Sequence, residues 1–347
     1  MNIKVSVIIP TYNVENYIEK CLNSIINQTL HEIEVIVIND GSTDKSSKIV
    51  DEISKKDSRV KLVNQDNAGV SKARNKGMML AQGDYITFVD PDDYIEINML
   101  EKLYMTAEKY NCDIVQCNYT IDNNGKYRPI SQDIKPNKVL KEQEIVKYLK
   151  NGLIEGSLAT YVWDKIFKRS YLKEHNLKFR EDLNMFEDWY FIMDAISYLS
   201  KFAFLQDSLY NYRITSNSLS RKYISNHEDL IVNLQSNKLH YIERWKLNIE
   251  PYKSKYLISL YDDIFKIINY ILSENYKLDK KIQLIKINSI LKSKFISNSV
   301  NKNNNKLYIS STSINKFYLI PILYGIRRKK IKFIYLWVQT YKFIKKG

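Results

Sequence analysis

Cysteine is scarce in this chain of 347 residues, which holds only Cys21, Cys112 and Cys117. No two of them form a CxxC pair, so the sequence predicts neither a disulfide framework nor a zinc site, and it fits a reducing cytoplasm. Glycine is also sparse, at nine residues, and none of them builds GxGxxG or GxxxxGK. This absence removes the main support for a dinucleotide-dependent dehydrogenase or a P-loop kinase.

Long apolar runs are missing at both ends of the chain. The N-terminal stretch MNIKVSVIIPTYN enters a short apolar strand without the longer hydrophobic region and cleavage site of a secretory signal, so we expect no export. Near the C-terminus the longest uncharged run, Phe317 to Ile326, has ten residues and is too short to span a bilayer.

Acidic residues disappear after Asp279. Residues 280–347 hold 16 Lys and Arg, whereas residues 1–279 hold 37 basic against 39 acidic residues, a net charge of −2. A nearly neutral body argues against a nucleic-acid channel, and the cationic tail predicts contact with an anionic partner. An AT-rich codon bias would explain part of the lysine content, but not the loss of acidic residues.

Strands and helices alternate at the start of the chain. Apolar, β-branched runs predict strands at 3–9, 34–39, 59–63 and 85–89, separated by helical patterns at 15–27, 42–55 (capped by Ser42 or Thr43) and 70–82. This alternation predicts a parallel sheet covered on both faces.

The rest of the chain becomes progressively more helical. We expect a helix at 98–110, a strand at 113–119, a loop at 122–137, helices at 141–151, 163–174, 187–199, 227–246, 254–273 and 279–293, and an Asn-rich connector at 298–305. We therefore divide the chain into a main domain at 1–220, a helical extension at 221–297 and a basic, aromatic tail at 298–347.

Polar turns follow three of the predicted strands: Pro10 to Asn13, Asn39 to Ser42, and Asp90 to Asp93. Ligands bind at the carboxyl ends of strands in such sheets. The carboxylates of the third turn repel one another unless a cation compensates, and such oxygen ligands suit Mg²⁺ or Mn²⁺. The alternative is a helix N-terminus, where Asp is favoured by capping and by the macrodipole.

Four segments in order carry a family resemblance: VSVIIPTYN (5–13), EVIVINDGSTDKS (34–46), NAGVSKARNKGMMLAQGDYITFVDPDD (67–93) and FEDWYF (186–191). Together they resemble family 2 glycosyltransferases, over roughly residues 3–220. The resemblance implies an α/β GT-A fold, Rossmann-like with a mostly parallel central sheet and helices on both faces, followed by a helical C-terminal region. It also implies an inverting, metal-dependent enzyme with a nucleotide-diphosphate sugar as donor, and it favours uridine diphosphate as the nucleotide.

The resemblance assigns donor-binding residues, namely Pro10, Tyr12, Asn13, Asp40, Asn67, Arg74, Asp90 and Arg213. Tyr12 would lie against the base and Asp40 would bind uracil or ribose; plain packing and an Asx turn are the respective alternatives. Arg74 has the alternative of an exposed helix charge. Arg213, with Ser216 to Ser218, resembles a loop that closes on the diphosphate.

Asp90 and Asp92 match the family's Asp-x-Asp motif, in which Asp92 would bind Mn²⁺ or Mg²⁺ and Asp90 would contact ribose or metal. The metal would act as a Lewis acid on the departing nucleoside diphosphate. Asp188 matches the catalytic base that removes the proton of the acceptor hydroxyl. The alternative is that Glu187 and Asp188 cap a helix.

Four residues are candidates for the acceptor side of the site. Trp163 and Lys165 resemble a W-x-K segment beside the acceptor cleft, where Trp163 would stack on a sugar unless it is a core residue. Glu187 and Trp189 would raise the proton affinity of Asp188.

The last part of the tail, 317–347, interleaves apolar and aromatic residues with basic ones, which predicts an interfacial helix on an anionic membrane surface. A helix docked on the protein itself and a nucleic-acid tail are the alternatives. We expect a cytoplasmic protein, peripheral on the inner face of the cell membrane. Its acceptor would be a glycan on a polyprenyl lipid, in bacterial capsule or exopolysaccharide synthesis. A protein-linked glycan acceptor and an inactive sugar-nucleotide-binding scaffold remain open, and the long helices after Ser220 offer a surface for pairing between subunits.

Overall fold

The computed structural model describes residues 2–132, 139–155, 158, 160–183, 185–215, 227–247, 249–272, 279–292, 304–305, 308, 316–328 and 330–346. The chain divides into two compact units, which are taken separately below. The first comprises Met1–Leu153 and Ser157–Ser220, and the second comprises Ile154–Gly156 and Arg221–Gly347.

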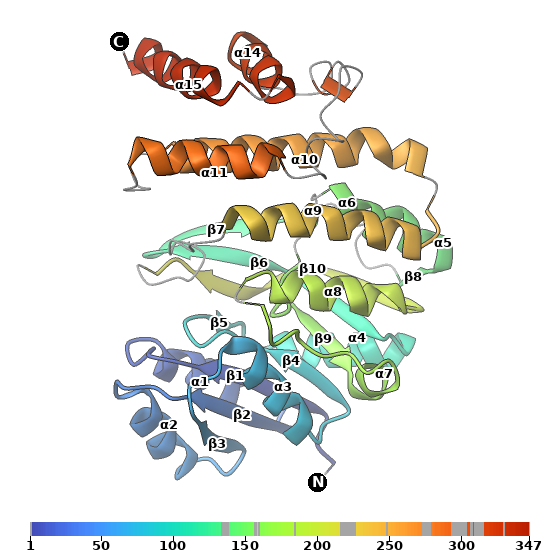
Figure 1. The fold of residues 1–347 in the computed structure, drawn as a ribbon. Helices are drawn as coiled ribbons and strands as arrows, with labels where there is room; N and C mark the ends of the chain where they lie inside the picture. The colour runs from blue at the N-terminus through green and yellow to red at the C-terminus, as the bar shows by residue number, and fades with distance from the viewer. Residues whose placement is uncertain are drawn as a thin grey trace. The chain divides into compact units, whose positions relative to one another are not determined.

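The first unit is built on one ten-stranded sheet (Figure 1). Its strands are β1 Val5–Thr11, β2 Ile33–Asp40, β3 Val60–Gln65, β4 Tyr85–Phe88, β5 Tyr94–Ile95, β6 Ile114–Asn123, β7 Lys126–Ile130, β8 Val139–Lys141, β9 Lys165–Lys168 and β10 Lys201–Arg213. The order is β3-β2-β1-β4-β9-β6-β10-β5, with β7 beside β6 and β8 beside β10. Strands β1, β2, β3, β4, β6 and β10 run in one direction, which confirms the mostly parallel sheet.

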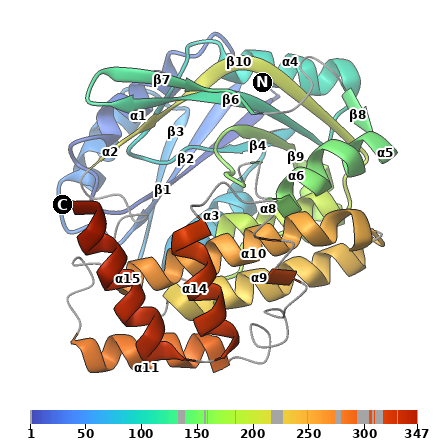
Figure 2. The ribbon, with the colours of Figure 1, turned by 90° about the horizontal axis from the view of Figure 1, so that it is seen from above.

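Helices cover both faces of this sheet (Figure 2). They are α1 Ile18–Ile26, α2 Ser46–Ser54, α3 Val70–Leu80, α4 Met99–Tyr110, α7 Arg169–Glu174 and α8 Glu187–Ser197. Between β8 and β9 the chain also forms α5 Glu142–Glu144, a π-helical turn η1 Ile145–Lys150 and α6 Asn151–Glu155. Alternate side chains of β1 explain the two layers. Val7 belongs to the core shared with α1 and α4, whereas Ile8 faces α3. There a Cβ on Gly77 would lie 2.4 Å from Ile8, so a glycine permits the close packing.

Two predictions from the sequence are wrong in the middle of the first unit. The expected loop at 122–137 contains β7, which forms a hairpin with β6 through Asn124 and Gly125, both with positive φ. This Asn-Gly pair is the usual signal for such a turn. The expected helix at 163–174 is strand β9 followed by α7, because the apolar run is inserted between β4 and β6. Short buried runs of this kind do not distinguish strand from helix.

Further differences concern elements that the sequence did not predict. Strands β5, β8 and β10 were not expected, and β8 occupies the start of the region predicted as a helix at 141–151. Helix α2 begins at Ser46, with Lys45 at its N-cap, so neither Ser42 nor Thr43 caps it. Of the expected connector at 298–305, residues 298–303 lie outside the described residues and 304–305 are helical.

The second unit is helical, with α9 His227–Arg244, α10 Ile249–Ile271, α11 Lys280–Lys292, α14 Lys316–Arg327 and α15 Ile331–Lys346. Helices α14 and α15 form a hairpin (Figures 1 and 2), and α15 also contacts α11. Gly325 permits the hairpin to close, since a Cβ there would lie 2.5 Å from Ile334. None of the helices in the described part of the chain is long and apolar enough to cross a bilayer.

Candidate active site

The first two polar turns form one connected structure at the carboxyl edge of the sheet. Strands β1 and β2 are parallel neighbours, so their ends meet at this edge. The backbone N–H of Asn13 donates to Ser42 Oγ at 3.1 Å, and Asn13 Oδ1 accepts from the backbone N–H of Thr43 at 2.8 Å. Pro10 is buried within β1, while Tyr12 is 49% exposed. The exposed Tyr12 ring is therefore available to a ligand and is not a core residue.

Asp40 holds the loop that leads into α3. Its Oδ1 accepts from Gln65 Nε2 at 2.7 Å and from the Ala68 N–H at 2.8 Å, and its Oδ2 accepts from the Gly69 N–H at 2.8 Å. These partners are distant from Asp40 in the sequence, so the alternative that Asp40 forms an Asx turn is wrong. Three hydrogen bonds leave little accepting capacity for a ligand. The loop also carries Asn67, which is exposed.

Arg74 is a buried cation that connects two distant segments. It is 3% exposed, so the alternative of an exposed helix charge is wrong. Its Nη2 donates to Asp90 Oδ1 at 3.1 Å, after β4. Its Nη1 donates to Asp188 Oδ1 at 2.5 Å and to Glu187 Oε1 at 3.3 Å, at the start of α8. Arg74 thereby brings the predicted base and the predicted metal-binding turn to one guanidinium group.

The electrostatics of this cluster favour a proton acceptor near neutral pH. The pKa of Asp188 is raised to about 7: burial is the main cause, the positive charge of Arg74 opposes the rise, and the negative charges of Glu187 and Asp90 contribute to it. Glu187 and Asp188 both lie in the first turn of α8, where the helix macrodipole stabilises negative charge. The capping alternative is wrong, because Phe186 is the N-cap residue, no side chain among the described residues caps the helix, and the oxygens of both acids accept from Arg74.

Asp93 is a structural residue and does not belong to a metal cluster. It is fully buried, with Oδ2 accepting from the Tyr210 hydroxyl and Oδ1 from the Arg213 N–H, each at 2.7 Å. Burial raises its pKa well above the usual range. The expected grouping of three metal-facing carboxylates at this turn is thus wrong. The helix N-terminus alternative is also wrong, because β5 follows the turn and α4 begins only at Met99.

Asp90 and Asp92 are left as the oxygen donors of this turn. Burial and then the charge of Asp90 raise the pKa of Asp92 to about 6, which shows the repulsion that a cation would relieve. Among the described residues, no group of three or more His, Cys, Asp or Glu side chains converges into a metal cage. Mg²⁺ and similar ions commonly use one or two carboxylates together with substrate phosphates. The two residues fit a cation that is shared with a diphosphate.

Arg213, at the end of β10, has unused donors beside the acidic turn. Its guanidinium lies over the rings of Tyr17 and Tyr94, at 5.3 and 5.2 Å. Its Nε and Nη2 are buried and have no hydrogen-bond partner among the residues that the structure describes. Such N–H groups suit phosphate oxygens. Ser216 to Ser218, expected in the same loop, lie outside the described residues.

Three of the acceptor-side candidates are buried. Trp163 is 3% exposed and stacks between Tyr161 and Tyr210, at 4.6 and 4.2 Å between ring centroids. Lys165 is 2% exposed and its Nζ donates to Asp164 Oδ1 at 2.6 Å, and Trp189 is 6% exposed. The core alternative is therefore correct for Trp163, and neither it nor Trp189 presents a ring face to an acceptor. The sequence reasoning missed Tyr161 and Tyr210, which frame Trp163.

Comparison with known proteins agrees with this geometry. The mostly parallel sheet with helices on both faces is an α/β fold of the GT-A class. The description "Glycosyl transferase family 2" matches residues 6–177. The uncharacterized glycosyltransferase YibD of Escherichia coli (strain K12) is 32% identical over 273 residues, which are 77% of this chain and 76% of that protein. The chain belongs to glycosyl transferase family 2, and the resemblance seen in the sequence is confirmed.

Two further matches extend the comparison. The uncharacterized glycosyltransferase EpsJ of Bacillus subtilis (strain 168) is 38% identical over 216 residues. This match spans 62% of this chain and 62% of EpsJ, less than two thirds of either. The crystal structure of S. aureus TarS 1–349 in complex with UDP-GlcNAc superposes with a TM-score of 0.73, covering 98% of this chain and 91% of that one at 23% identity. At this identity the likeness concerns the fold.

Proposed function

We propose that this protein transfers a sugar from a nucleotide-diphosphate sugar to a hydroxyl group of a glycan, with inversion at the anomeric carbon. The observation that carries the proposal is the bridge made by Arg74, which joins Asp90 at the end of β4 to Asp188 at the start of α8. Family membership supports the reaction class. The fold shared with a TarS structure that holds UDP-GlcNAc supports a UDP-linked donor.

Asp188 is the base in this proposal. Its carboxylate takes the proton of the acceptor hydroxyl as that oxygen attacks the anomeric carbon. Arg74 fixes one carboxylate oxygen, so the other is left to accept the proton. Glu187 shares the same guanidinium and keeps the local charge negative.

The donor lies in this proposal along the three polar turns. Tyr12 covers the base, Asn67 reaches the nucleoside, and Arg213 donates to diphosphate oxygens. Asp92, with Asp90, holds Mn²⁺ or Mg²⁺. When bound, this cation offsets the charge that develops on the departing nucleoside diphosphate.

A panel of nucleotide sugars tests the proposal directly. The full-length protein is incubated with each UDP- and GDP-sugar, with Mn²⁺ or with a chelator, and release of the nucleoside diphosphate is measured. We expect metal-dependent release from at least one UDP-sugar. An inactive sugar-nucleotide-binding scaffold would bind a donor and release no diphosphate, and this result would overturn the proposal.

The rate of transfer should rise with pH through the titration of Asp188. Its pKa is raised to about 7 by burial, and a base must be unprotonated to act. Below that pKa we expect kcat/KM to fall about tenfold for each pH unit, with a midpoint at or somewhat below 7, since a bound cation favours the carboxylate. A pH profile of UDP release measures this. A profile that stays flat from pH 5 to pH 8 would contradict the assignment.

We further propose that the acceptor glycan is carried by a polyprenyl lipid and that the tail rests on the inner face of the cell membrane. The α14–α15 hairpin is docked on one side, where Leu319, Leu323 and Ile334 are buried. Elsewhere on the hairpin Ile320, Tyr324, Phe333 and Leu336 are 38% to 60% exposed. Exposed Arg327, Arg328, Lys330 and Lys332 accompany them. Apolar and aromatic side chains among cations suit an anionic lipid surface.

Serine at these four exposed apolar positions tests the membrane proposal. Because none of the four is buried, the hairpin should stay folded while partition onto phosphatidylglycerol-containing vesicles falls by about tenfold or more. Sedimentation with vesicles measures the partition, and pure phosphatidylcholine vesicles show the part due to charge. The matched control replaces Met79 and Met105, which are 85% and 61% exposed in the first unit. Equal partition of both variants would refute a membrane role for the hairpin. Pairing between copies through the helices after Ser220 stays a prediction.

A further inference from the structure

A stack of aromatic rings runs from the surface of the first unit to its acidic turn. The ring of Tyr161 lies parallel to that of Trp163, at 4.6 Å and 13°. Trp163 stacks in turn on Tyr210, at 4.2 Å and 21°. Tyr119 meets Tyr161 and Trp163 edge-on, at 5.9 and 5.0 Å. The four rings therefore form one packed group.

Hydrogen bonds fix both ends of this stack. At the inner end the Tyr210 hydroxyl donates to Asp93 at 2.7 Å and accepts from the Asp90 N–H at 3.1 Å. At the outer end Lys165 Nζ donates to the carbonyl oxygen of Tyr161 at 2.6 Å. The position of the outer ring is thus set before any ligand arrives.

The outer ring is open, unlike the others in the stack. Tyr161 is 40% exposed, whereas Trp163 and Tyr210 are 3% and 0% exposed. The inner end of the stack contacts Asp90, which Arg74 joins to the proposed base, Asp188. Burial is the main cause that raises the pKa of Tyr161, and the charge of Asp188 is among those that raise it further. The positive charge of Lys165, from the same segment, acts on Asp188 in turn.

We propose that Tyr161 is the platform on which a pyranose ring of the acceptor stacks while its hydroxyl faces Asp188. This inference rests on the proposed function, because it places the acceptor beside the base of that reaction. The face of a pyranose that carries axial C–H groups is apolar and flat, and a rigid tyrosine ring covers it at low cost in conformational entropy. Trp163 and Tyr210 then support the platform from below and never touch the sugar.

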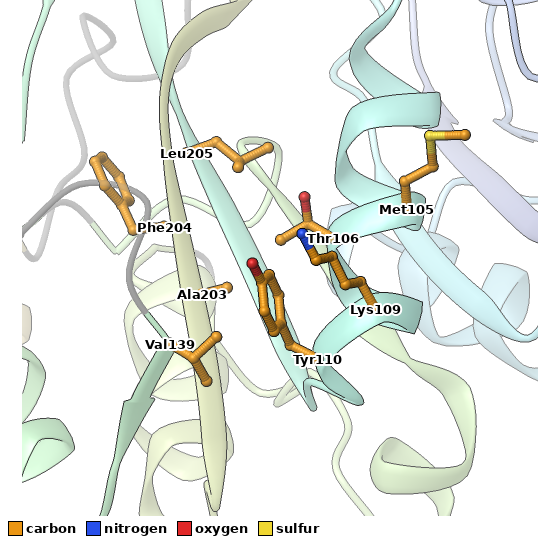
Figure 3. Close-up of a pocket in the computed structure, with 8 residues that line it drawn as sticks. All are labelled: Met105, Thr106, Lys109, Tyr110, Val139, Ala203, Phe204 and Leu205. Carbon is orange, nitrogen blue, oxygen red and sulfur yellow. The ribbon is translucent and has the colours of Figure 1, made fainter.

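A second exposed tyrosine offers a matched control. Tyr110 is 41% exposed and lines a hollow of about 240 Å³ between α4 and strands β8 and β10 (Figure 3). It lies four residues before β6 begins. Strand β6 runs parallel to β4, so Tyr110 belongs to the sheet edge opposite the acidic turn. Replacing it removes an equally exposed ring from the same unit without touching the proposed site.

The experiment uses saturation-transfer difference NMR on the full-length protein with UDP and diamagnetic Mg²⁺. The probes are methyl pyranosides of glucose, galactose, mannose, rhamnose, N-acetylglucosamine and N-acetylgalactosamine. We expect at least one to receive saturation on the protons of one ring face, and Tyr161→Ala to raise its Kd roughly tenfold. Tyr161→Phe, which keeps the ring, should change the Kd by less than about threefold. Tyr110→Ala should behave like the wild type.

Tyr161→Leu guards against a folding defect, because leucine still covers Trp163 but has no flat face. It should lose the sugar signal while keeping the far-ultraviolet circular dichroism of the wild type. A panel with no Tyr161-dependent signal overturns this inference, as does equal binding by Tyr161→Leu and wild type. Release of UDP from donor sugars needs no acceptor and is measured on the same variants. If the wild-type protein releases no UDP from any donor sugar, that result instead counts against the proposed function.

Discussion

Replacing Asp188 with asparagine should lower the rate of sugar transfer by about 10²- to 10⁴-fold. Asparagine keeps an oxygen that can accept from Arg74 Nη1, which Asp188 Oδ1 contacts at 2.5 Å, so the bridge to Asp90 should persist. What is lost is the group proposed to take the proton of the acceptor hydroxyl. Because the proposed donor site lies on the other side of this bridge, the Kd for UDP with Mn²⁺ should stay within about twofold. Transfer kinetics and calorimetric binding of UDP measure the two effects.

Asp194→Asn is the matched control for this substitution. Asp194 lies on the same helix, α8, and pairs with Arg180 at 3.5 Å. The Asp194→Asn substitution should leave both sugar transfer and UDP binding close to wild type. Full turnover in Asp188→Asn would show that another group removes the proton, and a parallel loss of UDP binding would show that Asp188 acts on the donor.

Replacing Arg74 with methionine should destabilise the first unit and abolish transfer. The change leaves Asp90, Glu187 and Asp188 without their shared cation, and their side chains keep only 26%, 17% and 21% exposure. Breaking a buried pair from one side costs about 3 to 5 kcal/mol, and this partial exposure favours the lower end, about 3 kcal/mol. Urea unfolding monitored by circular dichroism measures the change in the free energy of unfolding.

The pH dependence of the Arg74→Met effect distinguishes charge from packing. The pKa of Asp188 is already raised above its unfolded value, and loss of the guanidinium, which lowers it, raises it further. The folded variant then binds more protons than the folded wild type at pH values above about 7, so its stability relative to wild type should improve as the pH falls towards 7 and level off below it. Lys72→Met, an exposed position on α3, is the control. Equal stability of the two variants at neutral pH would exclude an energetic role for the bridge.

Lysine at position 74 should not restore the wild type. Arg74 contacts Asp90 through Nη2 and Asp188 through Nη1, which uses the forked geometry of the guanidinium. A lysine ammonium group is a single point of charge and cannot reproduce both contacts at their separate positions. This arrangement explains why a cation on α3 can hold two segments that are about a hundred residues apart in the chain.

Much of the first half of the fold was predictable from the sequence. The β-branched runs that form β1, β2 and β4 alternate with helices at the spacing of parallel crossovers, which predicts the parallel pairing that is observed. The strands β9 and β10 were not predictable in the same way. Each pairs with strands distant in sequence, β9 with β4 and β6, and β10 with β6 and β5. Local periodicity carries no information about such pairing.

The same distinction between local pattern and long-range contacts applies to the candidate active site. Residues such as Asp90, Asp92 and Asp188 stand out because carboxylates are costly beside buried strands and helices unless something compensates. Which partner compensates each of them is invisible in the sequence. Asp93 turned out to accept from Tyr210 and Arg213 inside the protein, although it stands beside Asp92 in an apparently uniform acidic turn.

By itself, the sequence determined that this is a family 2 glycosyl transferase chain with an acidic turn after a buried strand, an acidic pair at the start of α8, and a tail that has lost its acidic residues. Composition and local pattern suffice for these features because each depends on neighbouring residues. The tertiary structure alone decided that Arg74 joins Asp90 to Asp188, that Trp163 is covered, and that Tyr161 is the open ring. Those outcomes depend on long-range strand pairing and on the sharing of buried charges, which no local pattern of residues specifies.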